Sequence, residues 1–314
     1  MKVLKFGGTS LDNLPSVLHL VGQQNELICI VVSALGNTTD LLRKGRILSV
    51  RRKYLRWAQS IEGAGNIIHT IWDKASHVSL WPASRRQQDI LLGYGELCSA
   101  LLITRAINQY TNKRANFTHD SVVVSGPHGN AMIDDVVLST NRYDIHVHVV
   151  PGFYGVSFEG SVPCRKTIGP SGSDITAAAV GKFYQGHGDT DQVIIYTDVD
   201  GIYTADPRTV PDASIIPFMS RKEAVALGHA GGKVLHPRTP LFLFGTDVGL
   251  CVRRMGHEDG GTWVTMKGAG REIPLAVGLV SDQKMVTIIG YHMQGIPGIA
   301  ADVFQTIASR VVSV

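Results

Sequence analysis

Short apolar runs rich in valine and isoleucine alternate along this chain with longer amphipathic segments. The apolar runs are bounded by Gly, Ser or Asp, and they predict buried β-strands at residues 2–6, 27–33, 145–150 and 192–197. Apolar residues at helical spacing predict helices at residues 14–23, 89–108, 175–184, 222–227 and 238–244. This alternation is typical of an α/β fold with a mainly parallel sheet flanked by helices. In such sheets ligands bind beyond the carboxyl ends of the strands, so we expect the chemistry there.

Residues 40 to 92 have a different pattern, in which Trp, Leu and Ile are mixed with Arg, Lys and Gln at roughly helical spacing. This pattern predicts a helical insertion that lies on the sheet. The basic run from Arg43 to Arg56 could bind nucleic acid, or it could be the solvated face of a helix. We favour the solvated face, because no aromatic platform or zinc-ligand spacing accompanies the basic residues.

Residues 275 to 314 predict a strand, a second strand, a helix and the start of another strand. A complete βαββαβ module needs about twice as many elements. This segment is therefore half of such a ligand-sensing module or a small dimerising appendage. We expect two domains, at residues 1–268 and 275–314, with the helical insertion at about 40–92 inside the first.

Composition narrows the functional classes. The chain has 314 residues, of which 44% are hydrophobic, and 30 Lys and Arg against 26 Asp and Glu give a net charge of +4. So mild a charge does not favour nucleic acid or a membrane as partner, and it leaves a small anionic ligand open. No CxxC pair, signal peptide or run of roughly 18 apolar residues stands out. We expect a cytoplasmic protein with reduced, buried thiols.

The first candidate site is the segment KFGGTS, in which an apolar strand delivers Lys5, Gly7 and Gly8 ahead of a helical segment. Glycines let backbone amides approach an anion, a helix start adds partial positive charge, and a lysine adds a full charge. The arrangement favours phosphate binding, although a GG pair after a first strand also serves as a plain turn. Neither a Walker A loop nor a GxGxxG motif occurs in the chain.

Three further segments carry polar residues at predicted helix starts. VVSALGNTTD brings Ser33, Thr39 and Asp40 to the end of a strand, GYGE brings Glu96, and GPSGSD opens the next helix. Helix capping alone explains Thr39 or Asp40, as it does the aspartate of GPSGSD. A charge at a favourable helix end explains Glu96. Ligand binding is the alternative for each segment.

Two more segments follow strand ends. IIYTDVDGIYTADPR places Thr197, Asp198, Tyr203 and Arg208 after a buried strand, a density of polar groups that no hairpin requires. GGKVLHP places Lys233 behind glycines and just before a proline that breaks the local structure. Each of the six segments has a structural explanation of its own, but six in order at strand ends favour one shared ligand site.

The ordered set of six segments resembles the aspartate kinases of the amino acid kinase family, over residues 1 to 266. The segment MVTIIGYHMQGIPGIAADVFQTIA is similar to the opening of their regulatory ACT domain, a ferredoxin-like element. The resemblance implies the amino acid kinase fold, a homodimer, and transfer of the γ-phosphoryl group of ATP to the side-chain carboxylate of L-aspartate. The product, 4-phospho-L-aspartate, leads to lysine, threonine and methionine. Mg²⁺ would be carried by ATP, without a dedicated protein site.

The resemblance also implies roles for residues. Lys5 and Lys233 would stabilise the transferring phosphoryl group from opposite sides, and Asp174 would orient them. The implied nucleotide-binding residues are Lys5, Phe6, Gly7, Gly8, Thr197, Asp198, Tyr203, Arg208, Lys233 and Val234. The implied residues for the amino acid are Ser33, Thr39, Glu96, Phe153, Ser171, Gly172, Ser173 and Asp174. Glu96 would face the ammonium group, and the acceptor carboxylate, ionised at neutral pH, needs no general base.

Three departures from the family pattern surround the implied amino-acid pocket. Pro170 stands where the family has an arginine that binds a substrate carboxylate, while VVPGF and SVPCRK replace the usual T-Q-G-F and Gly-Arg-Thr patterns. Proline offers neither a charge nor an N–H donor. Either Arg165 or Lys166 reaches into the pocket instead, or the substrate is an aspartate analogue or derivative without a free carboxylate there. We favour aspartate, because the other implied pocket residues are retained.

A nucleotide-binding regulator with the same fold and no turnover is the alternative from another functional class. The retention of both lysines and Asp174 argues against it. A protein without turnover has no need of groups that act only on the transition state.

Overall fold

The computed structural model describes residues 1–78, 84–138, 145–188, 190, 192–267, 276–278, 301 and 305. The chain divides into two compact units, Met1–Leu279 and Val280–Val314. The predicted ACT-like segment at 275–314 lies outside the described residues except at 276–278, 301 and 305, so that expectation stays a prediction. The sheets of the described residues belong to the first unit.

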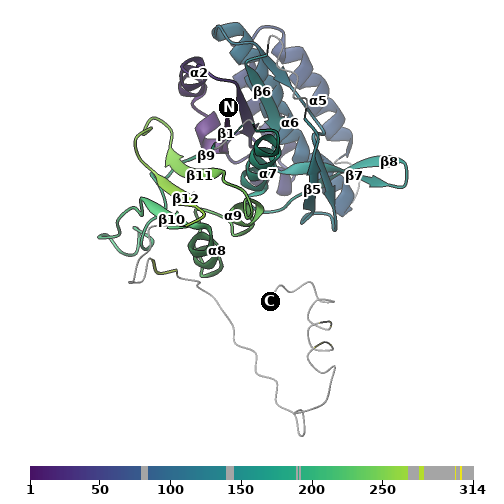
Figure 1. Cartoon of the computed structure of the whole chain (residues 1–314). Helices are drawn as coiled ribbons and strands as arrows, with labels where there is room; N and C mark the ends of the chain where they lie inside the picture. Colours follow the sequence, from purple (N-terminus) through teal and green to yellow (C-terminus); the bar gives the residue numbers. More distant parts are fainter. Residues whose placement is uncertain are drawn as a thin grey trace. The chain divides into compact units, whose positions relative to one another are not determined.

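The first unit is built on an eight-stranded sheet in the order β10-β12-β11-β9-β1-β2-β6-β3 (Figure 1). Neighbouring strands are parallel except for β11 and β12. The strands are β1 Lys2–Phe6, β2 Ile28–Val32, β3 Ala115–Phe117, β6 Val147–Pro151, β9 Gln192–Thr197, β10 Phe218–Ser220, β11 Gly249–Arg254 and β12 Thr262–Thr265. The prediction of a mainly parallel sheet is confirmed, and each of the four predicted strands overlaps an observed one.

The carboxyl ends of the central strands meet at one edge of this sheet. Phe6, the last residue of β1, is in register with Val32 of β2 and with Tyr196 of β9. Val32 is in turn in register with Pro151, the last residue of β6. The loops that follow these four strands are therefore neighbours, and they include three of the six segments with candidate chemistry.

Helices cover both faces of the sheet, as the alternation predicted. Ile28, Ile30 and Val32 of β2 join one core with α2, α4, α5 and α6, whereas Cys29 and Val31 join the other with α7. Burial on both faces explains why β2 is apolar at every position. The helices are α1 Gly8–Leu11, α2 Leu14–Gly22, α3 Thr38–Arg43, α4 Ile47–Ala58, α5 Ala64–Val78, α6 Arg85–Tyr110, α7 Gly172–Gly186, α8 Arg221–His229 and α9 Arg238–Phe242.

The segment predicted to be a helical insertion contains α3, α4 and α5, which precede α6. Tyr54 of α4 and Trp72 of α5 are fully buried with their ring centroids 5.5 Å apart, which packs these two helices together. In the basic run, Arg43, Arg52 and Arg56 are exposed, whereas the half-buried Arg51 forms an ion pair with Asp73 of α5. This agrees with the interpretation of the run as a solvated helix face.

The helix α6 passes through the core of the unit. A capping box fixes its start: the Gln87 amide donates to the Ser84 hydroxyl oxygen, and the Ser84 amide donates to the Gln87 side chain. In the described part of the chain it is the one helix long and apolar enough to cross a membrane, which the sequence pattern did not indicate. However, 72% of its most apolar 18-residue stretch is buried inside the protein, as expected of a core helix.

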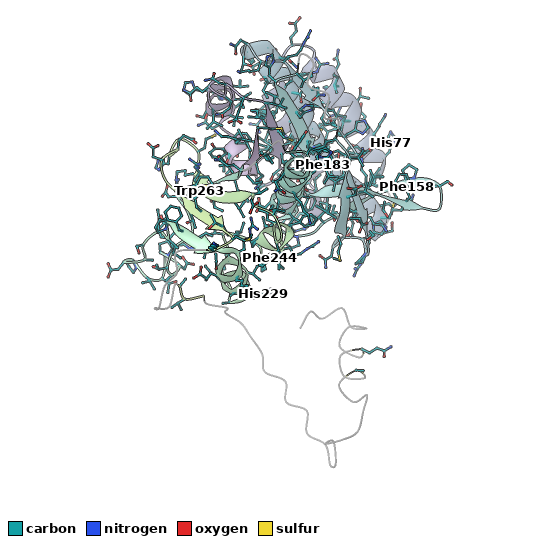
Figure 2. All side chains as sticks on the ribbon, in the orientation of Figure 1. His77, Phe158, Phe183, His229, Phe244 and Trp263 are labelled. Carbon is teal, nitrogen blue, oxygen red and sulfur yellow. The ribbon has the colours of Figure 1, made fainter. Side chains whose placement is uncertain are left out.

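A second sheet, in the order β5-β4-β7-β8, is absent from the sequence prediction. Its strands are β4 Val122–Ser125, β5 Met132–Val136, β7 Tyr154–Glu159 and β8 Val162–Thr167. Exposed positions alternate with buried ones along β4 and β5, and Phe158 of β7 is 63% exposed (Figure 2). These strands therefore lack the continuous apolar runs that marked the main sheet. The second sheet bears on function because β8 leads into the turn before α7.

Candidate active site

A buried ion pair lies at the edge where the central strands end. Lys5 comes from β1 and Asp174 from the first turn of α7, and Lys5 Nζ is 2.7 Å from Asp174 Oδ1. The two residues are 8% and 7% exposed, so water reaches the pair little. The structure thus brings together two of the three predicted catalytic residues. Asp174 does not cap α7, as the simplest interpretation of GPSGSD suggested; the N-cap is Ser171, with a left-handed φ of 53°.

Glu96 is buried within electrostatic range of Lys5. It lies inside α6, which begins at Arg85, and not at a helix start as its glycine neighbours suggested. The residue is 2% exposed, and its Oε2 atom has no hydrogen-bond partner among the described residues. Burial raises the pKa of the Glu96 carboxyl to about 8, against the Ala34 backbone hydrogen bond and the Lys5 charge, which lower it. A buried carboxyl oxygen without a partner suits a cationic donor from a ligand.

Two glycines join the end of β6 to the start of α7. A Cβ atom at Gly152 would lie 2.7 Å from Ser173 Cβ, and one at Gly172 would lie 3.0 Å from Phe153 Cα. Phe153 has a φ of 72°, a conformation that costs a non-glycine residue about 1 to 3 kcal/mol and persists where neighbours enforce it. The contacts place Phe153, Ser173 and Asp174, all implied by the resemblance, along one side of the site.

The glycines of KFGGTS have a packing role besides the predicted one. A Cβ atom at Gly8 would lie 2.6 Å from the Ala34 carbonyl oxygen, and Gly8 O accepts from the Gly36 amide at 3.0 Å. The Gly7 amide donates to the Tyr196 carbonyl oxygen at 3.3 Å, so that amide is already paired. Close approach of the loop after β2 therefore requires glycine at position 8, whatever ligand binds there.

The helix after β2 begins earlier than the sequence suggested. Asn37 is the N-cap residue of α3 and Thr38 its first residue, so Thr39 and Asp40 lie within the helix. Thr38 is fully buried, whereas Thr39 and Ser33, both implied in amino-acid binding, are half-buried.

The predicted nucleotide side follows β9 and is more open. Thr197 Oγ1 donates to Asp198 Oδ1 at 3.1 Å. Asp206 accepts from Nε and Nη2 of Arg208 at 3.0 and 2.7 Å. Hydrogen bonds from Arg208 lower the pKa of the Asp206 carboxyl to about 2, and the charge of Lys233 adds to this effect. Arg208 is thus held by an acid of its own loop.

The aromatic residues predicted on the nucleotide side have different surroundings. The Tyr203 hydroxyl donates to Asp200 Oδ2 at 3.4 Å, and Tyr203 is partly exposed. Phe6 is fully buried and stacks on Tyr196 with ring centroids 5.2 Å apart. The Phe6 side chain therefore belongs to the core.

Lys233 is exposed in the loop between α8 and α9, and Val234 is half-buried beside it. Its electrostatic effect on Asp206 shows that Lys233 lies near the loop after β9, the predicted nucleotide-binding loop. Within the described residues no ion pair joins Lys233 to Asp174. The expected position of Lys233 opposite Lys5, across a phosphoryl group, stays a prediction.

The two cations suggested as replacements for the family arginine are engaged by the second sheet and its loops. Pro170 is exposed. Arg165 Nε lies 3.2 Å from Asp120 Oδ1, and Lys166 Nζ donates to the Gly126 carbonyl oxygen at 3.1 Å. The idea that one of these side chains serves the acceptor pocket gains no support from their contacts.

Three polar residues near the site are absent from the candidates predicted from the sequence: Asp89, His236 and Arg238. Burial lowers the pKa of His236, and this histidine is within electrostatic range of Asp174. Asp89 and Arg238 hydrogen-bond the segment that enters the α7 turn, at residues 167 and 168. His236 lies within GGKVLHP and Arg238 follows that motif directly, so extending the motif by one residue would have included both. Nothing in the sequence distinguished Asp89 from a residue at a helix start.

Comparison with known proteins accounts for this arrangement. The amino acid kinase family matches residues 1–252. An aspartokinase of Mycolicibacterium smegmatis is 32% identical over 99% of this chain and 69% of its own length. An aspartokinase of Geobacillus stearothermophilus is 28% identical over 99% of this chain and 70% of its own length.

A solved structure agrees with these relatives. The crystal structure of E. coli aspartokinase III in complex with aspartate and ADP has a TM-score of 0.82 and 25% identity, covering 100% of this chain and 75% of that one. The fold and the sequence matches lead to the same conclusion. The chain belongs to the amino acid kinase family, and within that family it is related to the aspartokinases.

Proposed function

We propose that this protein is an aspartate kinase, which transfers the γ-phosphoryl group of ATP to the side-chain carboxylate of L-aspartate and forms 4-phospho-L-aspartate. The buried Lys5–Asp174 ion pair is the observation that carries the proposal. It fixes a cation at the edge of the sheet, between the acidic Glu96 and the loop after β9. The E. coli relative whose structure was solved with aspartate and ADP supports the choice of both substrates.

The lysines perform the electrostatic part of this reaction. The acceptor carboxylate is already ionised at neutral pH, so the protein has no proton to remove from it. What remains is to hold two anions in line and to stabilise the charge on the transferring group. Lys5, held by Asp174, supplies a fixed positive charge, and Lys233 supplies a second one from the nucleotide side. Mg²⁺ carried by ATP would neutralise the phosphate oxygens further; the described residues include no cluster of three or more potential metal ligands.

Glu96 recognises the ammonium group of the amino acid in this proposal. Its Oε2 atom lacks a partner, and its burial would be offset by a charge-assisted hydrogen bond. Because burial raises the pKa of Glu96 to about 8, the bound ammonium group must draw the carboxyl into its ionised form near neutral pH. Ser173 and the Phe153 turn would then fix the acceptor carboxylate relative to Lys5.

A coupled assay of ADP release tests the proposal, with purified full-length protein and a panel of L-aspartate, its α-amide, its N-acetyl form and L-glutamate. We expect aspartate-dependent ADP release that requires Mg²⁺. ATP binding without ADP release for any acceptor would contradict the enzyme assignment and support the regulator alternative. Hydroxylamine trapping of the product would confirm that an acyl phosphate forms.

A derivative of aspartate without a free α-carboxylate is the second candidate acceptor, and Pro170 is the observation that favours it. The contacts of Arg165 with Asp120 and of Lys166 with the Gly126 carbonyl oxygen favour this candidate over a replacement cation in the pocket. Loss of a charged hydrogen bond weakens binding by about 1.5 to 3 kcal/mol. If the α-amide of aspartate has a higher kcat/KM than L-aspartate, the derivative is the substrate.

A further inference from the structure

The turn between β4 and β5, at residues 126 to 131, is bonded to the segment that enters the active site. Lys166 Nζ donates to Gly126 O at 3.1 Å, and the Ala131 amide donates to Thr167 O at 3.0 Å. This turn has no role in the proposed mechanism. Its bonds nevertheless converge on residues 166 to 169, immediately before Pro170 and the start of α7.

Asp89 of α6 holds one flank of this contact. It is 2% exposed, and its Oδ2 atom accepts from His128 Nδ1 at 2.7 Å and from the Gly129 amide at 3.2 Å. Its Oδ1 atom accepts a short hydrogen bond from the Thr167 hydroxyl. One buried carboxylate therefore joins α6, the 126–131 turn and the end of β8.

Arg238 of α9 holds the other flank. Its Nη1 atom donates to the Asn130 side chain and to Ile168 O, both at 3.0 Å, and its Nη2 atom donates to Ala131 O at 2.8 Å. A planar guanidinium group with donors at fixed angles fixes the relative positions of the atoms it joins. Arg238 therefore joins the same two segments through bonds separate from those of Asp89.

The segment held in this way needs external support. Gly169 has a φ of 96° and Ser171 a φ of 53°, and between them Pro170 has no N–H to donate. A left-handed serine is disfavoured by roughly 1 to 2 kcal/mol and persists where surrounding contacts enforce it. Two residues further on lies Ser173, followed by Asp174, which binds Lys5.

We propose that Asp89, Thr167 and Arg238 are positioning residues for the phosphoryl acceptor, acting through the turn at 169–174. This inference rests on the proposed kinase function. A displacement of residues 167 and 168 would also displace Ser173, which packs against Gly152 on the proposed acceptor side. The nucleotide-side loop after β9 receives none of these bonds, so ATP binding stays independent of them.

Thr167→Val is the sharpest test, because it removes the hydroxyl donor and nearly preserves the shape. In the full-length protein we expect the KM for aspartate to rise about tenfold or more, with the KM for ATP changed less than about twofold. Thr167→Ser restores the donor and should restore the KM for aspartate. Thr104→Val is the matched control: Thr104 is a buried threonine whose hydroxyl bonds within α6, to Ala100 O.

A second variant, Arg238→Met, breaks the opposite flank and should raise the KM for aspartate in the same selective way. Thermal unfolding of every variant is measured beside the kinetics. If Thr167→Val and Arg238→Met lower the melting temperature but leave the KM for aspartate within about twofold of the wild type, the role is structural and the inference is overturned. Equal rises in the KM for both substrates would also overturn it. A wild-type protein without acceptor-dependent ADP release would instead overturn the proposed function.

Discussion

The proposed acceptor side, around Glu96 and the start of α7, and the proposed nucleotide side, after β9, are built differently. On the acceptor side, Glu96, Ser173 and Asp174 are 2%, 6% and 7% exposed, and glycine contacts close enough to exclude a Cβ atom join β6 to α7. On the nucleotide side, Arg208 has 76% of its side chain exposed, and Lys233 is exposed too. Asp206 and Asp200, in the loop after β9, form ion pairs with Arg208 and Arg254.

The two sides differ in whether their charged groups are buried or exposed. Buried groups act at low dielectric and lose little to salt, but each needs a partner because an unpaired buried charge is costly. Exposed charged groups are screened by water and salt, and positioning them costs little free energy. They can also adapt to a flexible ligand. We infer that the acceptor side is preorganised for a small rigid amino acid, whereas the nucleotide side adjusts to ATP.

The largest effect should come from breaking the buried pair. Lys5→Ala should lower kcat about a thousandfold, since it removes a fixed charge from the transferring group. It should also destabilise the fold by about 3 to 5 kcal/mol, because Asp174 is left buried without a partner. Steady-state kinetics and urea unfolding measure the two effects. The double variant Lys5→Ala/Asp174→Ala should recover stability without activity; a single variant as stable as the wild type would contradict the account of this pair.

A substitution at Lys233 tests the contribution of an exposed cation. Lys233→Ala should lower kcat by at least about a hundredfold while the free energy of unfolding changes by less than about 0.5 kcal/mol. Lys222→Ala, an exposed lysine on α8, is the matched control. Near-normal turnover would remove Lys233 from catalysis and leave Lys5 as the principal cation.

The pH dependence of acceptor binding sharpens the contrast further. Ammonium binding requires ionised Glu96, whose pKa is raised to about 8 by burial. Each pH unit below that pKa lowers the ionised fraction about tenfold, so the KM for aspartate should fall roughly 50-fold between about pH 6 and pH 8. Initial rates across this range, with saturating ATP, measure it. Glu96→Gln should give a high KM that is flat with pH, and a flat wild-type profile would contradict the role of Glu96.

The same carboxyl predicts a stability trend of definite sign. A raised pKa means that the folded protein holds the proton more tightly than the unfolded chain does. The stabilisation is therefore complete below the ordinary pKa of glutamate and is lost as the pH rises through about 8. Urea unfolding of Glu96→Gln should lack this loss, so the variant should exceed the wild type in stability by the largest margin at alkaline pH.

The smallest effect is expected at the nucleotide loop. Arg208→Ala should raise the KM for ATP about tenfold at low salt and less at high salt, because an exposed charge is screened. Arg43→Ala, in the exposed basic run of the insertion, should change neither KM. A KM for ATP that responds to Arg208→Ala equally at all salt concentrations would indicate a desolvated contact instead.

The sequence predicted those parts of the fold that follow from a single strong hydrophobic pattern. Strands buried on both faces, such as Ile28–Val32, are apolar at every position and were found. The second sheet was not predicted, because three of the five positions of a strand such as Met132–Val136 are exposed. Helix starts were misplaced where several polar residues stand in a row, because local sequence cannot decide which of Asn37, Thr38 and Thr39 leaves the helical conformation.

For the candidate site, sequence motifs named residues but not their burial or partners. The Lys5–Asp174 pair joins residues far apart in the chain, and its closeness follows from the register of β1 and the position of α7. The same long-range geometry engages Arg165 with Asp120 and brings Arg238 to the turn before α7. No local pattern carries such information, because each contact depends on the whole sheet.

One helix, α6, carries both Asp89 and Glu96, and this limits how the protein can evolve. The two residues are seven positions apart, which is about 10.5 Å and nearly two complete turns, so they share a helix face. Inserting or deleting a single residue between them would rotate one carboxylate by about 100° relative to the other. The acceptor site would then lose either its ammonium partner or the anchor of its turn. We therefore expect length variation among relatives in the loops of the insertion and none within this part of α6.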